Sequence, residues 1–514
     1  MNRFGALLAP RLVRNVLANW LALGTATVVG FVLTPYMLQH LGDTGFGLWV
    51  LVTTLTGYYG LLDFGFRNSI SRFVAHYAAN DEAENLGRVL STALVTNLAL
   101  GVLVLVMAGV VAWNLDRILT VPGDWTQTAR GLVLVFGLGS ALGFPLNLFG
   151  YVLEGFQRFT WIGGVQAAVT LVRAGLTVWV LSRGYGVVAV GVVTIATTVA
   201  GSLIYGAAVH RIYPRLRIRW ASVDHAMFRQ LAGYGLVAFG ISIAALLRFQ
   251  ADALVIGAFL SVQAVAHFSI ASKLVFYVTD VVQAMAWVFT PVFSHLDAKR
   301  DLRQLGHALI KANRYSSFIA FPLTAFVVVA GQSLIAVWVG SRYVSSYPVL
   351  IALLLPTSLY LAQAGSPKLL YGMARHSVLA RMFLLEGVAN IALSIALVRW
   401  YGILGVALGT AIPMALISLF VLPVYVCRLL KLRLWTYLWD VHGQPLLLSV
   451  PLALFVWHVD GWLQPADYRT MVAELALGAL FYGSEVLVLA WFTEGVKDGL
   501  SGFWTRLSER SASR

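Results

Sequence analysis

Residues 41–78 read LGDTGFGLWVLVTTLTGYYGLLDFGFRNSISRFVAHYA, and this stretch decides how the rest of the chain is interpreted. Its first half is apolar and aromatic enough to lie in a lipid bilayer. Its second half carries Asp63, Arg67 and Arg72, with no turn signal other than glycines. Charged side chains on a membrane helix are costly unless they face water or one another. We therefore expect a hydrated space beside this helix, and a substrate that passes through it.

The composition of the whole chain is that of a membrane protein. Of its 514 residues, 59% are hydrophobic and only 11% are charged, whereas about 25% of the residues of soluble domains are charged. Apolar runs of roughly 20 residues, the length that a membrane-spanning helix needs, recur from end to end. The alternating segments of about ten residues that build outer-membrane barrels are absent. The composition predicts an all-α polytopic bundle of the inner-membrane type.

The apolar runs predict about fourteen transmembrane helices, the second of them bent at its glycines. The formal net charge is +14, but the basic residues gather at alternate helix ends, as membrane topology requires, so nucleic acid is not expected as a partner. Most of the 36 Lys and Arg fall on one side, which predicts that both termini are cytoplasmic. The predicted spans are approximately 15–39, 46–77, 89–113, 132–152, 162–181, 187–210, 231–260, 264–293, 310–330, 347–370, 378–398, 403–427, 445–463 and 470–492.

An internal repeat is visible in the sequence. VLEGFQRF (152–159) is similar to LLYGMARH (369–376), and LSRGYGVVAVG (181–191) to LVRWYGILGVA (397–407), with an offset of about 216 residues. Six predicted spans separate equivalent points, so the two copies share one orientation, related by a pseudo-twofold axis along the membrane normal. The predicted domains are an N-terminal six-helix lobe (1–212), a basic cytoplasmic connector (213–230), a C-terminal six-helix lobe (231–428), and two extra helices with a cytoplasmic tail (429–514).

Four cations inside the predicted spans are candidates for substrate binding. Asp63 and Arg67 stand four residues apart, as do Arg248 and Asp252, so each pair could form a local ion pair on its helix. Alternatively, the cations line a central hydrated cavity and attract an anionic substrate, since the planar fork of arginine donates two parallel hydrogen bonds to phosphate oxygens. The other two cations have no acidic neighbour at helical spacing. The predicted substrate-binding cations are Arg67, Arg173, Arg248 and Lys273.

Polar residues in the spans are also candidates for gating or ion coupling. A buried carboxylate can take up a proton near neutrality. Glu386 and Asn390 lie one turn apart, and Thr410 lies in the next span, so their oxygen atoms could coordinate Na⁺, a hard cation. The alternative is a hydrogen bond that bridges helices. The predicted gating or ion-coupling residues are Asp63, Asp252, Asp280, Glu386, Asn390 and Thr410.

The sequence predicts no catalytic residue and no cofactor other than a coupling H⁺ or Na⁺. The ten histidines show no metal-binding spacing, and no nucleotide-binding motif is present. Glu154 and Arg158, at the end of the fourth predicted span, are expected to form an interfacial ion pair.

On these motifs the chain resembles the oligosaccharide flippases that serve O-antigen, capsule or exopolysaccharide biosynthesis. The resemblance lies in HLGDTGFGLW (40–49), in GLLDFGFRNSISRFVA (60–75), and in Arg248, Asp252 and the following ALVIGAFLSVQAVAHFSIASKL (253–274). LLYGMARH and the ends of the eleventh and twelfth spans fit as well. The similarity covers nearly the whole chain in register.

The resemblance implies the fold of the multidrug/oligosaccharidyl-lipid/polysaccharide superfamily, with two six-helix lobes around a central cavity. It implies alternating access that moves undecaprenyl-diphosphate-linked glycans from the cytoplasmic to the outer leaflet of the bacterial inner membrane. Arg67 and Arg248 match positions where relatives carry cavity cations. Lipid II flippases of the superfamily have a sodium site on helices 7, 11 and 12, which Glu386, Asn390 and Thr410 match in type, while an acid expected near Gly235 is missing.

The predicted function is therefore that of a flippase for a lipid-linked oligosaccharide. Its expected partners are the undecaprenyl-diphosphate-linked glycan, membrane lipids and other polysaccharide assembly proteins. A lipid II flippase and a drug/cation antiporter of the same superfamily are the alternatives, and the antiporter should favour acidic cavity residues over arginines. A membrane glycan polymerase or ligase would need a sizeable outer loop, whereas every predicted outside loop is under about 20 residues.

Overall fold

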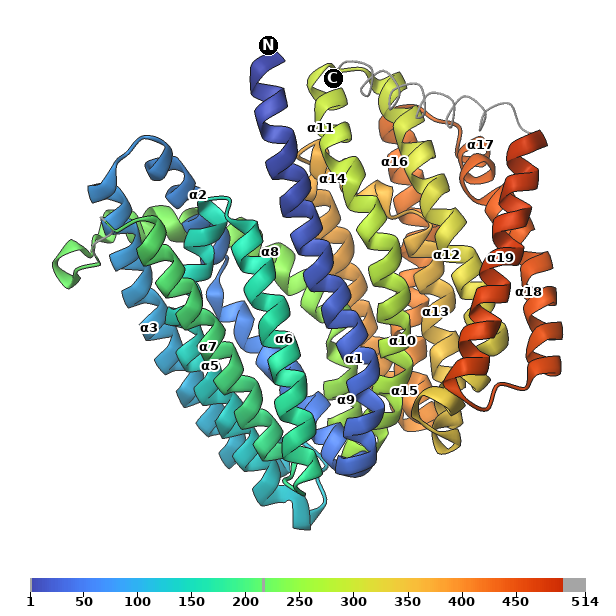
Figure 1. The fold of residues 1–514 in the computed structure, drawn as a ribbon, viewed down its shortest axis with the longest axis horizontal. Coiled ribbons are helices and arrows are strands. Elements are labelled where there is room, and N and C mark those ends of the chain that lie inside the picture. The colour runs from blue at the N-terminus through green and yellow to red at the C-terminus, as the bar shows by residue number, and fades with distance from the viewer. Residues whose placement is uncertain (1, 215–217, 493–514) are drawn as a thin grey trace. The chain divides into compact units, whose positions relative to one another are not determined.

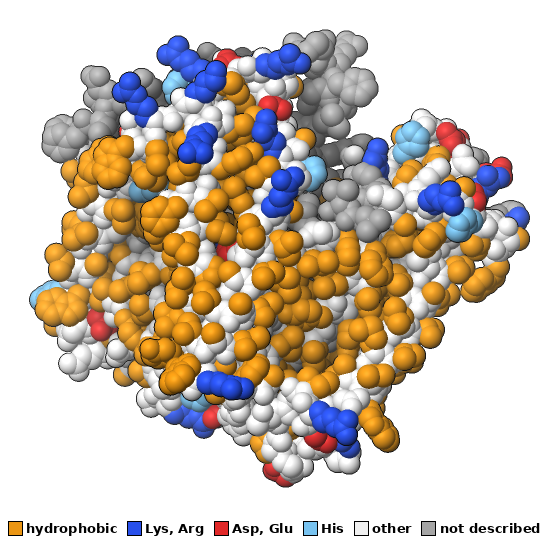
Figure 2. Space-filling view, turned by 180° about the vertical axis from the view of Figure 1, so that it is seen from behind, with side chains coloured by type: hydrophobic (Ala, Val, Ile, Leu, Met, Phe, Trp, Pro, Cys, Tyr) orange, Lys and Arg blue, Asp and Glu red, His pale blue; other side chains and the backbone are white. Residues whose placement is uncertain are grey.

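The computed structural model describes residues 2–214 and 218–492, and over these residues the chain forms helices joined by turns, without strands. Eleven helical segments of the described chain are long and apolar enough to cross a membrane. This confirms the predicted all-α polytopic membrane fold. Hydrophobic side chains cover most of the face drawn in Figure 2, and Lys and Arg side chains lie toward its margins. The predicted C-terminal tail falls largely on residues 493–514, outside the described residues.

Two of the eleven segments contain a break in the helix. Gly42 (φ 66°) interrupts α1 (Asn2–Tyr59), and Gly402 (φ 57°) interrupts α15 (His376–Leu416). A positive φ is a conformation that glycine adopts without strain. Each of these segments therefore holds two helices, while α8 (His225–Phe249) is not among the eleven. The number of about fourteen spans and the symmetry of two lobes stay predictions.

The contacts between residues group the chain into two compact units. Unit 1 comprises Met1–Ile270 and Ala380–Thr410, and unit 2 comprises Ala271–Leu379 and Ala411–Arg514. The lobes predicted from the repeat have other bounds and remain a prediction.

Unit 1 contains the helices that carry most of the candidate site residues. In Figure 1, α3, α5 and α7 lie side by side, and α6 packs against α1 and α7. The helices of unit 1, besides α1, α8 and part of α15, are α2 (Phe66–Ala79), α3 (Ala83–Trp113), α4 (Leu115–Ile118), α5 (Thr126–Gly155), α6 (Phe159–Ser182), α7 (Val187–Ile212), α9 (Ala251–Phe259) and the first turns of α10 (Val262–Ala286).

Unit 2 is built around one long helix. This helix, α12 (Leu302–Val339), packs against α13, α18 and α19. The other helices of unit 2, besides the rest of α10 and the two ends of α15, are α11 (Thr290–Ala298), α13 (Tyr347–Leu361), α14 (Gly365–Gly372), α16 (Leu422–Leu430), α17 (Leu434–Leu438), α18 (Gln444–Leu463) and α19 (Tyr468–Phe492).

Two helix breaks separate the charged pairs that the sequence places four residues apart. After α1 the chain makes a 3₁₀ turn (Gly60–Asp63), passes through Phe64 (φ 46°) and Gly65 (φ 75°), both left-handed, and begins α2. The seventh predicted span likewise breaks at Gln250, between α8 and α9. The predicted bend at the glycines of the second span is therefore present. Neither charged pair lies on one continuous helix, so neither has the spacing that a local helical ion pair requires.

The ends of α5 and α14, which carry the first pair of repeat motifs, make the same turn. The N–H of Phe156 donates to Val152 O at 2.9 Å and that of Arg158 to Leu153 O at 2.9 Å. In the second motif, Met373 N–H donates to Leu369 O at 2.9 Å and Arg375 N–H to Leu370 O at 2.8 Å. The residue between the two donors is left-handed in both turns, Gln157 with φ 55° and Ala374 with φ 54°. Many helices end in this turn, and its left-handed residue is usually a glycine.

We predict that Gln157→Gly and Ala374→Gly each stabilise the protein. A side chain at a left-handed residue costs about 1 kcal/mol, and both side chains are exposed, so little packing is lost. The melting temperature of the detergent-solubilised protein should rise by about 1–2 °C for each. As a control, Ala392→Gly, at an exposed site inside α15, should lower it. A fall for both turn variants would contradict the prediction.

Candidate functional site

Unit 1 contains a cavity between its membrane helices whose wall is largely apolar but carries charged, hydroxyl and amide groups, for which it is named the polar cavity here. The cavity has a volume of about 480 Å³. A neighbouring pocket of about 430 Å³ shares Gly60, Asp63 and Arg67 with it and adds Glu154. The charged end of the opening sequence stretch thus faces open space, as its composition suggested. The cavity is lined by residues of α1, α2, α5 and α7 and the turn between α1 and α2, among them the polar residues Thr56, Tyr59, Asp63, Arg67, Ser140, Asn147, Tyr151, Thr194 and Thr198 and the apolar residues Phe136, Phe144 and Ile195.

Arg67, at the start of α2, forms an ion pair with Glu154 at the end of α5. Its Nη2 lies 2.5 Å from Glu154 Oε1, and its Nε lies 3.3 Å from Oε2. Ser71 Oγ donates a further hydrogen bond to Glu154 Oε2 at 3.1 Å. The Arg67 side chain remains 58% exposed. The guanidinium is therefore positioned by a carboxylate but open to a second anion.

The expected ion pair between Glu154 and Arg158 is wrong. The described residues give Glu154 only Arg67 as an ion-pair partner. The reason lies in the turn at the end of α5: Gln157 is left-handed, and Arg158 already occupies the position directly before α6. A spacing of four residues across such a turn does not bring the two side chains to one helix face.

Asp63 plays a different part from the one expected of a neutralising partner. Its Oδ2 accepts the backbone N–H of Arg67 at 3.1 Å, so the carboxylate caps the start of α2. Its Oδ1 is buried and has no hydrogen-bond partner in the described part of the chain. Because an unsatisfied buried carboxylate oxygen is costly, this atom favours a hydrated cavity beside it.

Arg248 pairs with Glu386 rather than with Asp252. The Nε of Arg248, at the end of α8, lies 2.5 Å from Glu386 Oε1 on α15, and both side chains are 1% exposed. The guanidinium carbon also lies 4.4 Å from the centre of the Phe383 ring. Removing one partner of such a buried pair leaves the other charge without compensation, which typically costs about 3–5 kcal/mol.

Four buried residues form an oxygen cluster: Asp252, Asn390, Ser394 and Thr410. Thr410 Oγ1 lies 2.9 Å from both carboxylate oxygens of Asp252 and 3.1 Å from Asn390 Oδ1. Ser394 Oγ donates to Asn390 Oδ1 at 2.9 Å. A hydroxyl group has one proton, so Thr410 can donate a hydrogen bond to only one of these three oxygen atoms. The oxygen cluster therefore has more acceptor oxygens than protons to share among them.

Two glycines bring the two arms of α15 together at the oxygen cluster. A Cβ added at Gly409 would lie 2.6 Å from the backbone nitrogen of Ser394, and one at Gly405 would lie 2.7 Å from the carbonyl carbon of Leu397. Small residues four positions apart allow this backbone contact, as in close-packed membrane helices. This approach places Thr410 next to Asn390. The sequence prediction grouped Glu386, Asn390 and Thr410 but missed Ser394, whose signal was its position one turn after Asn390.

Arg173, on α6, is held by hydroxyl groups. Its Nε donates to Thr197 Oγ1 at 3.1 Å, and its Nη2 to Thr198 Oγ1 at 2.9 Å. Within the described residues it has no carboxylate at ion-pair distance. Its positive charge is therefore solvated but not neutralised by the described side chains.

The two other predicted residues, Lys273 and Asp280, belong to unit 2, on α10, and both are half-buried. Unit 2 also contains polar groups that the sequence prediction missed. Lys368, on α14, is 6% exposed, and its Nζ lies 3.4 Å from the centre of the Trp287 ring. Glu474, on α19, is fully buried, and neither carboxylate oxygen has a hydrogen-bond partner in the described part of the chain. Both are charged residues inside predicted membrane spans, and this position in the sequence could have identified them as candidates.

The sequence matches a known family over most of its length. The profile of a family described as "Polysaccharide biosynthesis protein" matches residues 41–348. An uncharacterized membrane protein of Bacillus subtilis (strain 168), EpsK, is 23% identical over 452 residues, which cover 87% of this chain and 88% of that protein. A protein of Shigella flexneri named as a candidate O-antigen transporter is 22% identical over 79% of this chain and 96% of its own.

Two solved structures share the fold. A lipid II flippase, MurJ, in an inward closed conformation, superposes with a TM-score of 0.72 at 12% identity, over 91% of this chain and 98% of its own. An inward-facing multidrug resistance transporter of the MATE family superposes with a TM-score of 0.64 at 16% identity, over 80% of this chain and 94% of its own. Together with the family description and the relative named for O-antigen transport, these structures agree with the prediction of a transporter rather than an enzyme. This chain belongs to the polysaccharide biosynthesis protein family and has the fold of the MOP superfamily transporters.

Proposed function

We propose that this transporter is a flippase for an undecaprenyl-diphosphate-linked oligosaccharide. It would move the glycan from the cytoplasmic to the outer leaflet of the bacterial inner membrane by alternating access, with both termini in the cytoplasm. The product would serve surface polysaccharide biosynthesis. The relative named for O-antigen transport and the family description support this substrate class.

The observation that carries the proposal is the cavity of unit 1 with Arg67 on its wall. A glycan that crosses hydrocarbon unaided loses the hydration of many hydroxyl groups, each at a cost of a few kcal/mol. A polar cavity inside the membrane fold lowers that cost. An exposed arginine held by Glu154 offers its remaining N–H groups to a diphosphate. On binding, the diphosphate would replace Glu154 as the ion-pair partner of Arg67. When the substrate leaves, the pair with Glu154 would form again, so binding is reversible.

We further propose that the oxygen cluster couples transport to an ion. Its surplus of acceptor oxygens is satisfied by a proton on Asp252 or by Na⁺ among the oxygens of Asp252, Asn390 and Thr410. These are the oxygen ligands that hard cations prefer. The neighbouring Arg248–Glu386 pair holds the end of α8 against α15 and so transmits ion binding to α8.

Deletion of the gene should cause a polyprenyl-diphosphate-linked glycan to accumulate on the cytoplasmic side of the membrane. The expected measurement is mass spectrometry of extracted lipids, combined with enzymatic accessibility of the glycan in oriented vesicles. Expression of the wild-type gene from a plasmid should restore export. Normal surface polysaccharide and no accumulated lipid in the deletion strain would refute the proposal, and a build-up of lipid II with arrested peptidoglycan synthesis would favour the peptidoglycan alternative.

Arg67→Ala should reduce glycan export by at least about tenfold, since a charge-assisted hydrogen bond to phosphate is worth about 1.5–3 kcal/mol. The variant that exchanges the two charges, Arg67→Glu with Glu154→Arg, separates binding from structure. It should recover membrane level and thermal stability, because the pair can re-form, but not export, because the cation has moved. Export in the exchanged variant at the wild-type level would show that the pair is only structural.

Na⁺ or protons should stabilise the wild-type protein through the oxygen cluster. We expect the melting temperature to rise with NaCl relative to KCl at equal ionic strength, or to rise as the pH falls if the ion is H⁺. Thr410→Val, which has the shape of threonine without its hydroxyl, should lose the Na⁺ effect, whereas Thr410→Ser should retain it. Asp252→Asn should lose either effect. An unchanged ion response in Asp252→Asn would sink the coupling role of this cluster.

A further inference from the structure

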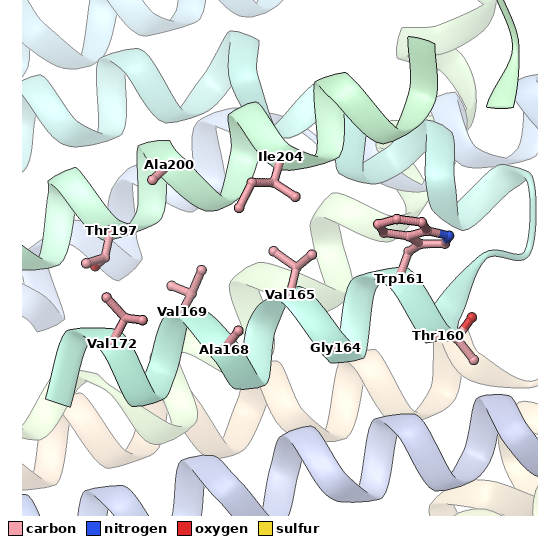
Figure 3. Close-up of a pocket in the computed structure, with 10 residues that line it drawn as sticks. All are labelled: Thr160, Trp161, Gly164, Val165, Ala168, Val169, Val172, Thr197, Ala200 and Ile204. Carbon is pink, nitrogen blue, oxygen red and sulfur yellow. The ribbon is translucent and has the colours of Figure 1, made fainter. Parts of the chain in front are cut away.

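An apolar groove runs along the surface of unit 1 between α6 and α7. It has a volume of about 540 Å³ and is lined by aliphatic side chains of both helices, Trp161 and two threonines. In Figure 3, Val165, Val169 and Val172 of α6 point toward α7, and Ile204 of α7 points back toward α6. From Trp161 to Val172 the groove is about 16 Å long, at 1.5 Å per helical residue.

The groove is open to the side, where lipid surrounds a membrane protein. Trp161 is 46% exposed, Val172 55% and Ile204 46%. At Gly164, in the middle of the groove, an added Cβ would meet no atom within 4 Å. The groove therefore has free space at its middle, and its lining is apolar apart from Thr160 and Thr197, as a hydrocarbon chain would require.

Arg173 follows Val172, the last residue of α6 that lines the groove. Thr197, which lines the groove, accepts a hydrogen bond from Arg173 Nε, and Thr198, which lines the polar cavity, accepts one from Nη2. Two of the five guanidinium N–H groups are thus used, and the described residues give the other three no acceptor. Arg173 itself lines neither space, but it links one lining residue of the apolar groove to one of the polar cavity, and the described residues give it no carboxylate partner.

We propose that this groove binds the polyprenyl chain of the transported lipid while Arg173 binds its diphosphate. This inference rests on the proposed function. It adds a second binding site for the substrate, besides the one at Arg67. The chemistry of the three parts matches one molecule: a hydrocarbon tail in the groove, an anion at the guanidinium, and a glycan in the polar cavity that Arg67 and Thr198 both line.

The charge of Arg173 favours this occupant over a neutral lipid. An arginine inside hydrocarbon is costly unless an anion or water compensates it. In the predicted topology α6 begins on the cytoplasmic side, and Arg173 lies about 14 Å from the outer end of α6. The groove then runs from Arg173 toward the cytoplasm. The hydrocarbon chain of a lipid in the outer leaflet points in this same direction, because its head group faces outward. The site is therefore that of the substrate after translocation.

The test is photolabelling of the purified full-length protein in lipid nanodiscs. The probe is a polyprenyl diphosphate with a diazirine in its chain, and labelled peptides are mapped by mass spectrometry. We expect labels within 160–172 and 197–204, displaced by unlabelled polyprenyl diphosphate but not by phosphatidylglycerol at the same mole fraction. Arg173→Gln should reduce this labelling by about tenfold.

Matched variants test the groove itself. Gly164→Leu fills it and should reduce labelling and glycan export, while Gly175→Leu should reduce neither, since Gly175 lies on the same helix, also has open space around it, and does not line the groove. Labels elsewhere only, or labels displaced equally by phosphatidylglycerol, would overturn the inference and leave the flippase proposal standing. No labelling together with no lipid-linked glycan in the deletion strain would overturn both.

Discussion

A guanidinium group inside a membrane needs an acceptor or an anion close to it, and the three candidate arginines of unit 1 (Arg67, Arg173 and Arg248) meet this need in three ways. Arg248 lies in a buried pair with Glu386, so its charge is neutralised within the protein. Arg67 pairs with Glu154 but remains more than half exposed, so its partner can be exchanged. Arg173 rests on two neutral hydroxyls and keeps its full charge. The three side chains thus form a series, from a charge neutralised by a buried carboxylate to a charge without a carboxylate partner among the described residues.

The breaks in the helices make this series possible. On an unbroken helix, residues four apart would meet on one face, and Asp63 and Asp252 would neutralise the arginines beside them. The left-handed residues Phe64 and Gly65 turn Asp63 into a cap for α2, and the break at Gln250 directs Asp252 to Thr410. Each arginine is thereby left to a partner far away in the sequence, where a change of conformation can alter the pairing.

Sequence patterns predicted the class of fold and the identity of most candidate side chains, because hydrophobic runs and buried charges are properties of composition. They also predicted the bend at residues 60–65, since glycine marks left-handed backbone. They did not predict the partners. The link between Glu154 and Arg67 spans 87 positions, and that between Arg248 and Glu386 spans 138. Such pairs depend on how helices rotate and pack, which a local spacing of four residues cannot report.

The close approach of the two arms of α15 has a mechanical consequence. Where side chains separate two helices, rotamer changes let the gap widen or narrow; at Gly405 and Gly409 backbone meets backbone, and that freedom is absent. Asn390, Ser394 and Thr410 are mounted on this stiff hairpin, while Asp252 reaches them from α9. Three of the four oxygen-bearing side chains thus keep a fixed spacing. In the proposed ion site, discrimination between ions of different radius would then fall to the fourth, the carboxylate of Asp252, which lies on a separate helix.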